Sequence, residues 1–344
     1  MTLRRITMLA AVITLALVSG VPEAQAGTTP ITSCGQVVAT NAVLTLDLVC
    51  PGGHGVLVGA DGITIDLKGF QLEGDRTSGQ FGVWDSGFDG VTVKNGVVRN
   101  FDDGVRLVSQ ADKATVSNVL ASGNAGDGIV IFGDSASVNS SAASGNTATG
   151  ISVSGQGATI KASTAAGNGT SGIVVAGTAA TIKSSTAPGN AVTGISVLGG
   201  SVTVASSAAP GNGANGVVLT GPAATIKSST APGNGAIGIV ANGTAATIKS
   251  VTASGNAIAG FSVTGSSATI ASSTTSGNGN VGIAVSGDAP VITGNRAEAN
   301  GFAGGVSDHF GRGINTAGWT TPPVGKNISR GNDEAFDCFP TSLC

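Results

Sequence analysis

The charged residues of this 344-residue chain are unevenly distributed, and fifteen of them lie within residues 61–113. Cleavage or epimerisation of a polysaccharide needs carboxylates and a basic partner in one cleft. This segment contains such a set, which we take as the candidate catalytic residues: Asp85, Asp89, Arg99, Asp102, Asp103 and Arg106. A lyase of this kind would hold Ca²⁺ on its clustered carboxylates. We favour the alternative that these side chains are solvated turn residues.

Residues 123–300 carry only nine charges, and no pair of carboxylates lies near the middle of this stretch. Acid–base cleavage is therefore not expected there. Its lysines recur at multiples of a 22-residue step and would suit an acidic glycan. Together with two residues near the C-terminus they are the candidate ligand-binding residues: Lys161, Lys183, Lys227, Lys249, His309 and Trp319. Alternatively, the lysines only prevent exposed strands from pairing with other chains, and Trp319 closes the last turn.

Other ligand classes find little support in the composition. Beyond residue 26 the chain has two histidines, His54 and His309, and no CxxC or CxxH spacing, so we predict no metal site and no cofactor. The net charge of −3 gives no reason to expect nucleic acid. Threonines at 22-residue spacing, from Thr159 to Thr269, suggest an ice-binding face, but long lysine side chains two residues later would interrupt a flat lattice.

A 22-residue repeat must position all these side chains. Asparagines follow this step without interruption: Asn124, Asn146, Asn168, Asn190, Asn212, Asn234, Asn256, Asn278 and Asn300. Glycines from Gly128 to Gly304 and β-branched residues from Val138 to Ile292 keep the same step. Each repeat contains short stretches with β-branched residues at alternate positions, separated by Gly, Asn, Ser or Pro, which is typical of strands and turns.

A single repeat is too short to bury its own apolar face, so the repeats must stack. Stacked strands in register place equal residues above one another at about 4.8 Å. The spacing therefore predicts an all-β parallel β-helix of ten or more turns, with Ile129 and Ile131 and their equivalents pointing inward. We expect the asparagines to form a buried ladder of hydrogen-bonded amides. A role for them as sugar ligands is the alternative.

Two segments outside the regular repeats carry a resemblance. Residues 34–74, CGQVVATNAVLTLDLVCPGGHGVLVGADGITIDLKGFQLEG, and residues 90–107, GVTVKNGVVRNFDDGVRL, resemble the opening of secreted right-handed parallel β-helix proteins of the pectin-lyase-like superfamily. The regular array resembles the PbH1 repeats of NosD-type periplasmic proteins. The resemblance implies a right-handed coil. It indicates fold rather than activity, because the superfamily includes lyases, hydrolases, epimerases and adhesins.

The two ends of the chain predict export. Arg4 and Arg5, an apolar run and an Ala-Gln-Ala site suggest a signal peptide over residues 1–26. In an oxidising compartment we expect Cys34 to pair with Cys50 and Cys338 with Cys344, although four cysteines allow three connectivities. The predicted organisation is an N-terminal cap with the first turns (27–107), regular 22-residue repeats (108–306) and a C-terminal cap (307–344).

Two classes of function follow from these observations. The first is a secreted, non-catalytic β-helix that binds a polysaccharide or cell-surface glycan or serves as a structural spacer. The second is a carbohydrate-active lyase or epimerase with its site in the first turns. The few charges of the array favour the first class. We expect a monomer without a transmembrane span, located in the periplasm or at the cell surface.

Overall fold

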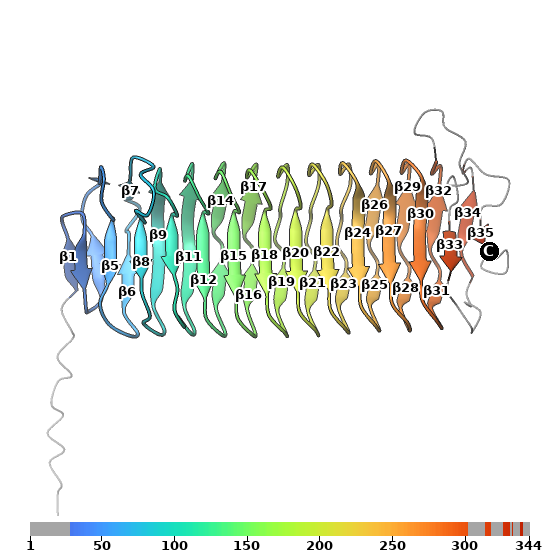
Figure 1. Cartoon of the computed structure of the whole chain (residues 1–344), viewed down its shortest axis with the longest axis horizontal. Helices are drawn as coiled ribbons and strands as arrows, with labels where there is room; N and C mark the ends of the chain where they lie inside the picture. The colour runs from blue at the N-terminus through green and yellow to red at the C-terminus, as the bar shows by residue number, and fades with distance from the viewer. Residues whose placement is uncertain (1–27, 302–313, 318–325, 331, 333–337, 340–344) are drawn as a thin grey trace, which may run out of the picture.

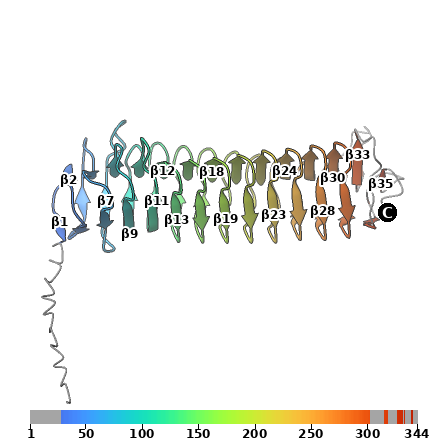
Figure 2. The ribbon, with the colours of Figure 1, turned by 90° about the horizontal axis from the view of Figure 1, so that it is seen from below.

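The computed structural model describes residues 28–301, 314–317, 326–330, 332 and 338–339. Every regular element among them is a β-strand, and every strand pairing is parallel. Figure 1 shows the turns stacked in chain order along one straight axis. Most turns contribute strands to three walls, two of which form the upper and lower rows of strands in Figure 2. The predicted parallel β-helix, with its ten or more turns, is confirmed.

Wall 1 is a sheet of fourteen strands in chain order. Its strands are β2 (Gln36–Val38), β5 (Val56–Val58), β8 (Val83–Asp85), β10 (Val105–Leu107), β12 (Ile129–Phe132), β15 (Ile151–Ser154), β18 (Ile173–Ala176), β20 (Ile195–Leu198), β22 (Val217–Thr220), β24 (Ile237–Asn242), β27 (Ala259–Thr264), β30 (Val281–Ser286), β33 (Ile314–Ala317) and β35 (Cys338–Phe339). Wall 1 carries the candidate site described below.

Wall 2 follows wall 1 in each turn. Its strands are β1 (Thr29–Ile31), β3 (Ala42–Leu44), β6 (Thr64–Asp66), the first half of β9 (Thr92–Arg99), the first half of β11 (Thr115–Ser122), β13 (Ser137–Asn139), β16 (Thr159–Lys161), β19 (Thr181–Lys183), β21 (Thr203–Ala205), β23 (Thr225–Lys227), β25 (Thr247–Lys249), β28 (Thr269–Ala271) and β31 (Val291–Thr293). Successive strands match threonine to threonine from Thr159 to Thr269.

Wall 3 completes each turn. Its strands are β4 (Leu48–Val49), β7 (Gln71–Glu73), the second halves of β9 and β11, β14 (Ala142–Ser144), β17 (Thr164–Ala166), β26 (Thr252–Ser254), β29 (Thr274–Ser276), β32 (Arg296–Glu298) and β34 (Ile328–Arg330). Between β17 and β26 the wall is reduced to isolated bridges at Thr186, Ala208 and Thr230. Those turns carry proline two residues further on, and proline has no N–H to donate to a neighbouring strand.

The core consists of identical residues stacked along the axis. Ile129, Ile151 and Ile173 are Cα partners in successive turns, and all three are fully buried. Two residues later the column of Ile131 and its equivalents is also buried. Because a 22-residue step keeps every side chain on the same wall, one apolar pattern builds the whole core. The predicted inward columns are confirmed.

The asparagine ladder forms at the bend from wall 3 to wall 1, and each of its nine residues is at most 2% exposed. The side-chain oxygen of Asn146 accepts hydrogen bonds from both the backbone N–H and the Nδ2 of Asn124, at 3.1 and 2.8 Å. The same pair of bonds recurs at every step and ends on Asn332 beyond Asn300. The predicted structural role of these amides is confirmed.

Glycine and alanine make the space in which the ladder fits. A Cβ at Gly128 would lie 2.7 Å from the Nδ2 of Asn146 and 2.9 Å from the Cβ of Ala143. Equivalent contacts surround Gly150 and Gly172. The fixed spacing of Ala, Asn and Gly in each repeat therefore reflects one packing unit, because a larger side chain at any of the three positions would displace the amide.

A second ladder, which the repeat pattern did not predict, lies at the bend from wall 2 to wall 3. The hydroxyl of Ser163 accepts the backbone N–H of Ser141 at 3.3 Å, and it donates to the backbone oxygen of Lys161 at 2.9 Å. Ser185 and Ser207 repeat this arrangement. These serines are buried and hydrogen-bonded, which makes them structural residues.

A disulfide cross-links the N-terminal turns. Cys34 and Cys50 form a disulfide with Cα atoms 5.6 Å apart, as predicted. The predicted Cys338–Cys344 bridge and the predicted signal peptide lie outside the residues whose side chains are described. In the described part of the chain we find no helix of sufficient length and apolarity for a membrane span.

Candidate functional site

Three aromatic rings gather on the outer face of wall 1 in its first turns. The ring of His54 stacks on that of Trp84 at a centroid distance of 4.7 Å, and Phe81 lies 5.5 Å from His54 and 6.0 Å from Trp84. Trp84 is at the centre of β8, between its in-register partners Leu57 and Arg106. All three rings are half-buried, so each keeps part of its surface open to solvent. We call this group the aromatic platform.

Two glycines allow the backbone segments that carry the platform to approach each other closely. A Cβ at Gly55, next to His54, would lie 2.3 Å from the backbone oxygen of Gly82. A Cβ at Gly82, next to Phe81, would lie 2.1 Å from a methyl carbon of Val98. Only glycine fits at these two positions, and the side chains beside them are thereby brought over the same strand.

The protonation state of His54 follows from its contacts. Its Nδ1 accepts the backbone N–H of Phe81 at 3.1 Å, which places the ring proton of a neutral imidazole on Nε2. Burial lowers the pKa of His54 and so favours this neutral form. The ring therefore offers one N–H donor beside two aromatic faces.

Arg106 links the platform to two carboxylates. Its guanidinium carbon lies 5.0 Å from the centroid of Phe81, and its Nη1 lies 2.6 Å from Oδ2 of Asp103. The other oxygen of Asp103 accepts the backbone N–H of Asp127 at 2.7 Å. Burial raises the pKa of Asp127, and the negative charge of Asp103 acts in the same direction. Arg106 thus lies between an aromatic ring and the buried carboxylate of Asp103, with the half-buried Asp127 beside them.

Of the six candidate catalytic residues, the structure brings only Asp103 and Arg106 into direct contact. Asp85 points into the core, fully buried, in the column of Val58 and Leu107. Its Oδ1 accepts the backbone N–H groups of Gly87 and Phe88 at 3.0 and 2.9 Å, whereas Oδ2 has no hydrogen-bond partner. Burial raises the pKa of Asp85.

Three other candidates serve the local structure. Asp89 is exposed in the bend between walls 1 and 2, where its Oδ1 accepts the backbone N–H of Asp112 at 3.0 Å. Asp102 accepts the backbone N–H of Gly79 at 2.6 Å. Arg99 lies on wall 3 and pairs with Glu73 at 2.8 Å, and this partner lowers the pKa of Glu73. These three residues therefore lie in three different parts of the coil.

The candidate ligand-binding lysines are all exposed on wall 2, which is a different wall from the platform. Lys161 is the Cα partner of Lys183, and Lys227 is the partner of Lys249. His309 and Trp319 lie outside the described residues. Among the described residues, no group of three or more His, Cys, Asp or Glu is arranged to hold a metal ion.

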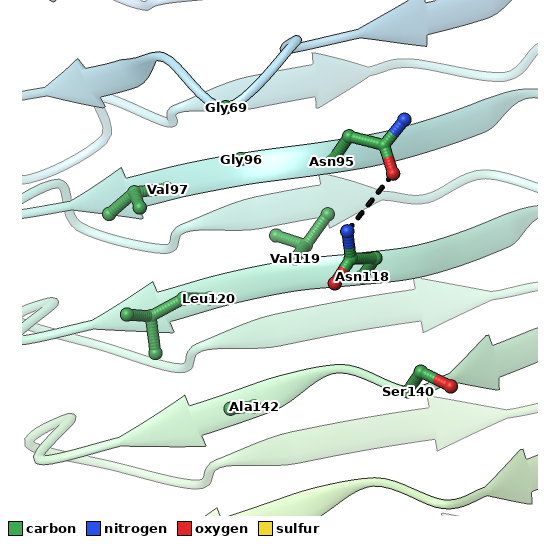
Figure 3. Close-up of a pocket in the computed structure, with 9 residues that line it drawn as sticks. All are labelled: Gly69, Asn95, Gly96, Val97, Asn118, Val119, Leu120, Ser140 and Ala142. Carbon is green, nitrogen blue, oxygen red and sulfur yellow. Dashed lines mark hydrogen bonds between the residues drawn. The ribbon is translucent and has the colours of Figure 1, made fainter.

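A groove of about 410 Å³ lies at the corner between walls 2 and 3 (Figure 3). It is open and shallow, and it is lined by Gly69, Asn95, Gly96, Val97, Asn118, Val119, Leu120, Ser140 and Ala142. The Nδ2 of Asn118 donates to Oδ1 of Asn95 at 3.1 Å, as the dashed line in Figure 3 marks. The side chain of Leu120 is 37% exposed beside these amides, so the groove offers both polar and apolar contacts.

Sequence reasoning missed the aromatic platform. The signal was available, because Phe70, Phe81, Trp84, Phe88 and Phe101 lie close together in a chain that has only ten phenylalanines and two tryptophans. Their orientation was not readable, since Phe101 is buried whereas Phe81 and Trp84 face outward. Asp127 was also missed, because it was counted among the scattered charges of residues 123–300 and not together with Asp103 of the turn before.

Stacked parallel turns with internal amide and hydroxyl ladders define this protein as a β-solenoid with its variable side chains on the outer walls. The chain belongs to the family described as right handed beta helix region, which matches residues 49–187 and 171–333. No curated protein matches it in sequence.

Solved structures with the same fold are distant in sequence. The periplasmic alginate epimerase AlgG superimposes with a TM-score of 0.52 at 14% identity, over 81% of this chain and 77% of that one. Pectate lyase Pel9A gives 0.42 at 16% identity, over 80% and 71%. The Dettilon tailspike protein gives 0.43 at 13% identity and 75% of this chain, which spans 55% of the tailspike. These likenesses concern the fold.

Proposed function

We propose that this protein is a non-catalytic β-helix that acts outside the cytoplasm and binds a glycan through the aromatic platform on wall 1. The observation that carries the proposal is the stack of His54 on Trp84 at 4.7 Å beside Phe81, in a chain with few aromatic residues. Aromatic rings present apolar faces that pack against the C–H faces of sugars, while their polar edges donate hydrogen bonds. The Nε2–H of His54 is such a donor.

The state of the nearby carboxylates supports a binding role over a catalytic one. Asp85, Asp89 and Asp102 each accept backbone N–H groups, and Asp85 lies inside the coil. Asp103 is shared between Arg106 and the backbone of Asp127. A general acid or base has to reach the substrate, and most of these groups are already engaged in the fold. The Cys34–Cys50 disulfide is compatible with an extracytoplasmic location.

The test is a glycan array probed with the purified protein, followed by titration of the best ligand. Trp84→Ala should weaken binding about tenfold or more, which corresponds to about 1.4 kcal/mol. Phe132→Ala is the matched control, because Phe132 is an exposed aromatic residue on the same wall outside the platform. If both variants bind like the unaltered protein while remaining folded, the platform is not the binding surface.

A second candidate function rests on Asp127. Burial raises its pKa beside Asp103 and Arg106, while its Oδ1 accepts the backbone N–H of Thr149 at 2.6 Å. A carboxyl with a raised pKa is what a general acid in a polysaccharide lyase, hydrolase or epimerase requires. A calcium-dependent lyase would in addition hold Ca²⁺ on carboxylates. AlgG, which shares the fold, is named as an epimerase of alginate.

This candidate is tested by incubating the protein with alginate and polygalacturonate, with and without added Ca²⁺, and measuring unsaturated products, reducing ends and uronate composition. Turnover that is lost in Asp127→Asn but kept in Asp89→Asn would establish the enzyme. Turnover that is unchanged in Asp127→Asn would point to a contaminating activity. Absence of turnover together with Trp84-dependent binding supports the non-catalytic function.

A further inference from the structure

We infer that wall 2 is a second binding surface, and that it takes an extended anionic polysaccharide along the column of Lys161, Lys183, Lys227 and Lys249. The inference goes beyond the proposed function, because it concerns another wall and another ligand chemistry. We call these four residues the lysine column.

The charge distribution is the first support. From residue 135 to residue 287 the only charged side chains of the chain are these four lysines. The register places all of them in one line, with Ala205 between the two pairs. Within the described residues none of the four has an ion-pair partner, and each is exposed. This long stretch of the chain therefore presents all of its charge, with one sign, on one wall.

Prevention of strand pairing does not account for these residues. Each of β16, β19, β23 and β25 is already paired with a strand on both sides, so none of them is a sheet edge that needs protection. Lysines in directly adjacent strands repel one another, and like charges in such positions destabilise a sheet. The pairs Lys161–Lys183 and Lys227–Lys249 thus work against stability, which favours a role in binding.

The length of the lysine column favours an extended ligand. At about 4.8 Å per strand, the four steps from Lys161 to Lys249 span about 19 Å. The same register line continues through Asn139 and Ser117 to Lys94, a further three strands away. A compact anion would meet one lysine pair, whereas a linear polymer with charges at intervals would meet both.

The groups beside the lysines suit a glycan. A half-buried threonine precedes each lysine by two residues on the same face, namely Thr159, Thr181, Thr225 and Thr247. The corner groove of Figure 3 lies beside the same line, since Asn118 and Ser140 directly follow Ser117 and Asn139. Hydroxyl and amide groups next to cations can bond the hydroxyls of a sugar while the lysines meet its carboxylate or sulfate groups.

The experiment compares two double variants with the same change in net charge. Binding of polygalacturonate and of dextran sulfate is measured for the unaltered full chain, for Lys227→Gln/Lys249→Gln and for Lys68→Gln/Lys113→Gln. Lys68 pairs with Asp66, and Lys113 lies in a turn outside the column. We expect the column variant to bind at least one of the two polymers about tenfold more weakly, and the control variant to change less than about twofold.

Three further measurements sharpen the test. Fully methyl-esterified polygalacturonate, which has lost its charge, should not bind, and salt should weaken the binding of the charged polymers steeply. The melting midpoint of the column variant should be unchanged or raised, because repulsion is removed. Trp84→Ala should leave this binding intact, so that failure of the lysine column and failure of the platform are distinguished.

Several results would overturn the inference. It fails if neither charged polymer binds at low salt, or if both double variants lose affinity equally, since overall charge would then be responsible. It also fails if duplex DNA or phosphatidylserine vesicles bind the column as tightly as the two glycans do. In that case the surface recognises negative charge without regard to the sugar.

Discussion

The side-chain oxygen of Asn212 accepts two hydrogen bonds from Asn190, one from its backbone N–H at 2.9 Å and one from its Nδ2 at 3.1 Å. Asn212 in turn donates both of its equivalent groups to Asn234. The side-chain oxygen of each asparagine therefore accepts hydrogen bonds from the turn before it. The ladder fixes the register of successive turns, because a chain shifted by one residue would leave buried N–H groups without acceptors.

Replacement of Asn212 by Ala should destabilise the protein by about 1–3 kcal/mol, because two donors of Asn190 lose their buried acceptor. The measurement is urea or thermal unfolding followed by circular dichroism. Asn242→Ala is the control, since Asn242 is exposed at the end of β24, and its effect should stay within about 0.5 kcal/mol. Equal effects of the two substitutions would remove the ladder from the stabilising contacts.

Replacement of Gly216 by Ala should be as harmful as loss of the amide. The added Cβ would lie 2.6 Å from the backbone oxygen of Gly238 and 2.7 Å from the Cβ of Ala231. Overpacking of this kind costs about 1–3 kcal/mol. Gly53→Ala, where nothing lies within 4 Å of the new carbon, should be close to neutral. An undiminished melting midpoint for Gly216→Ala would contradict the packing unit of alanine, asparagine and glycine.

Deletion of one whole period, residues 189–210, should leave a folded coil that is shorter by about 4.8 Å. Deletion of residues 189–199 should not, because inward and outward columns would no longer match. Circular dichroism reports the folding of both proteins, and small-angle scattering reports their length. Equal folding of the two deletions would show that turns are not the interchangeable units of this structure.

Asp85 should make the stability of the protein depend on pH. Its pKa is raised by burial above the ordinary value of 3.8, so the unfolded chain loses this proton before the folded one does. The contribution of Asp85 to stability is thus greatest at low pH, falls as pH rises through 3.8 toward the folded pKa, and stays low above it. Asp85→Asn removes the charge and retains an oxygen for the N–H groups of Gly87 and Phe88.

The measurement is the free energy of unfolding of Asp85→Asn and of the unaltered protein between about pH 3 and pH 8. The difference should shift in favour of the variant as pH rises. The comparison isolates Asp85 from other carboxyls, such as Glu73, whose pKa is lowered and whose effect has the opposite sign. A difference that does not vary with pH would show that Asp85 titrates alike in the folded and unfolded chains.

The structure could be predicted from the sequence wherever the 22-residue spacing of the repeats is constant. From Asn124 to Asn300 the 22-residue step never changes, so one unit defined the inward columns, the ladder and the outward lysines together. In the first turns the step varies from one turn to the next, as the unequal spacing of the in-register partners Val56, Val83, Val105 and Ile129 shows. Without a common period, alternation alone could not assign an orientation to each side chain.

The candidate site lies in this irregular part, which explains what was missed. Asp85 occupies a core position that valine or leucine fills in the neighbouring turns. A charged residue type predicts a surface position, whereas the strand register puts Asp85 inside the coil. The stack of His54 on Trp84 joins residues of different turns through two glycines with close backbone neighbours. Such contacts depend on loop lengths that no periodic pattern encodes.

The constant step also governs how this protein can change over generations. Residues 179–190 and 223–234 are identical, and they lie two whole turns apart. Recombination between the matching gene segments would remove or add turns in pairs without disturbing the ladder of asparagines on either side. A loss of that kind would delete the turn of Ala205 and place three lysines in successive strands of wall 2. A gain or loss of turns would therefore change the length of the coil and the spacing of its surface charges together.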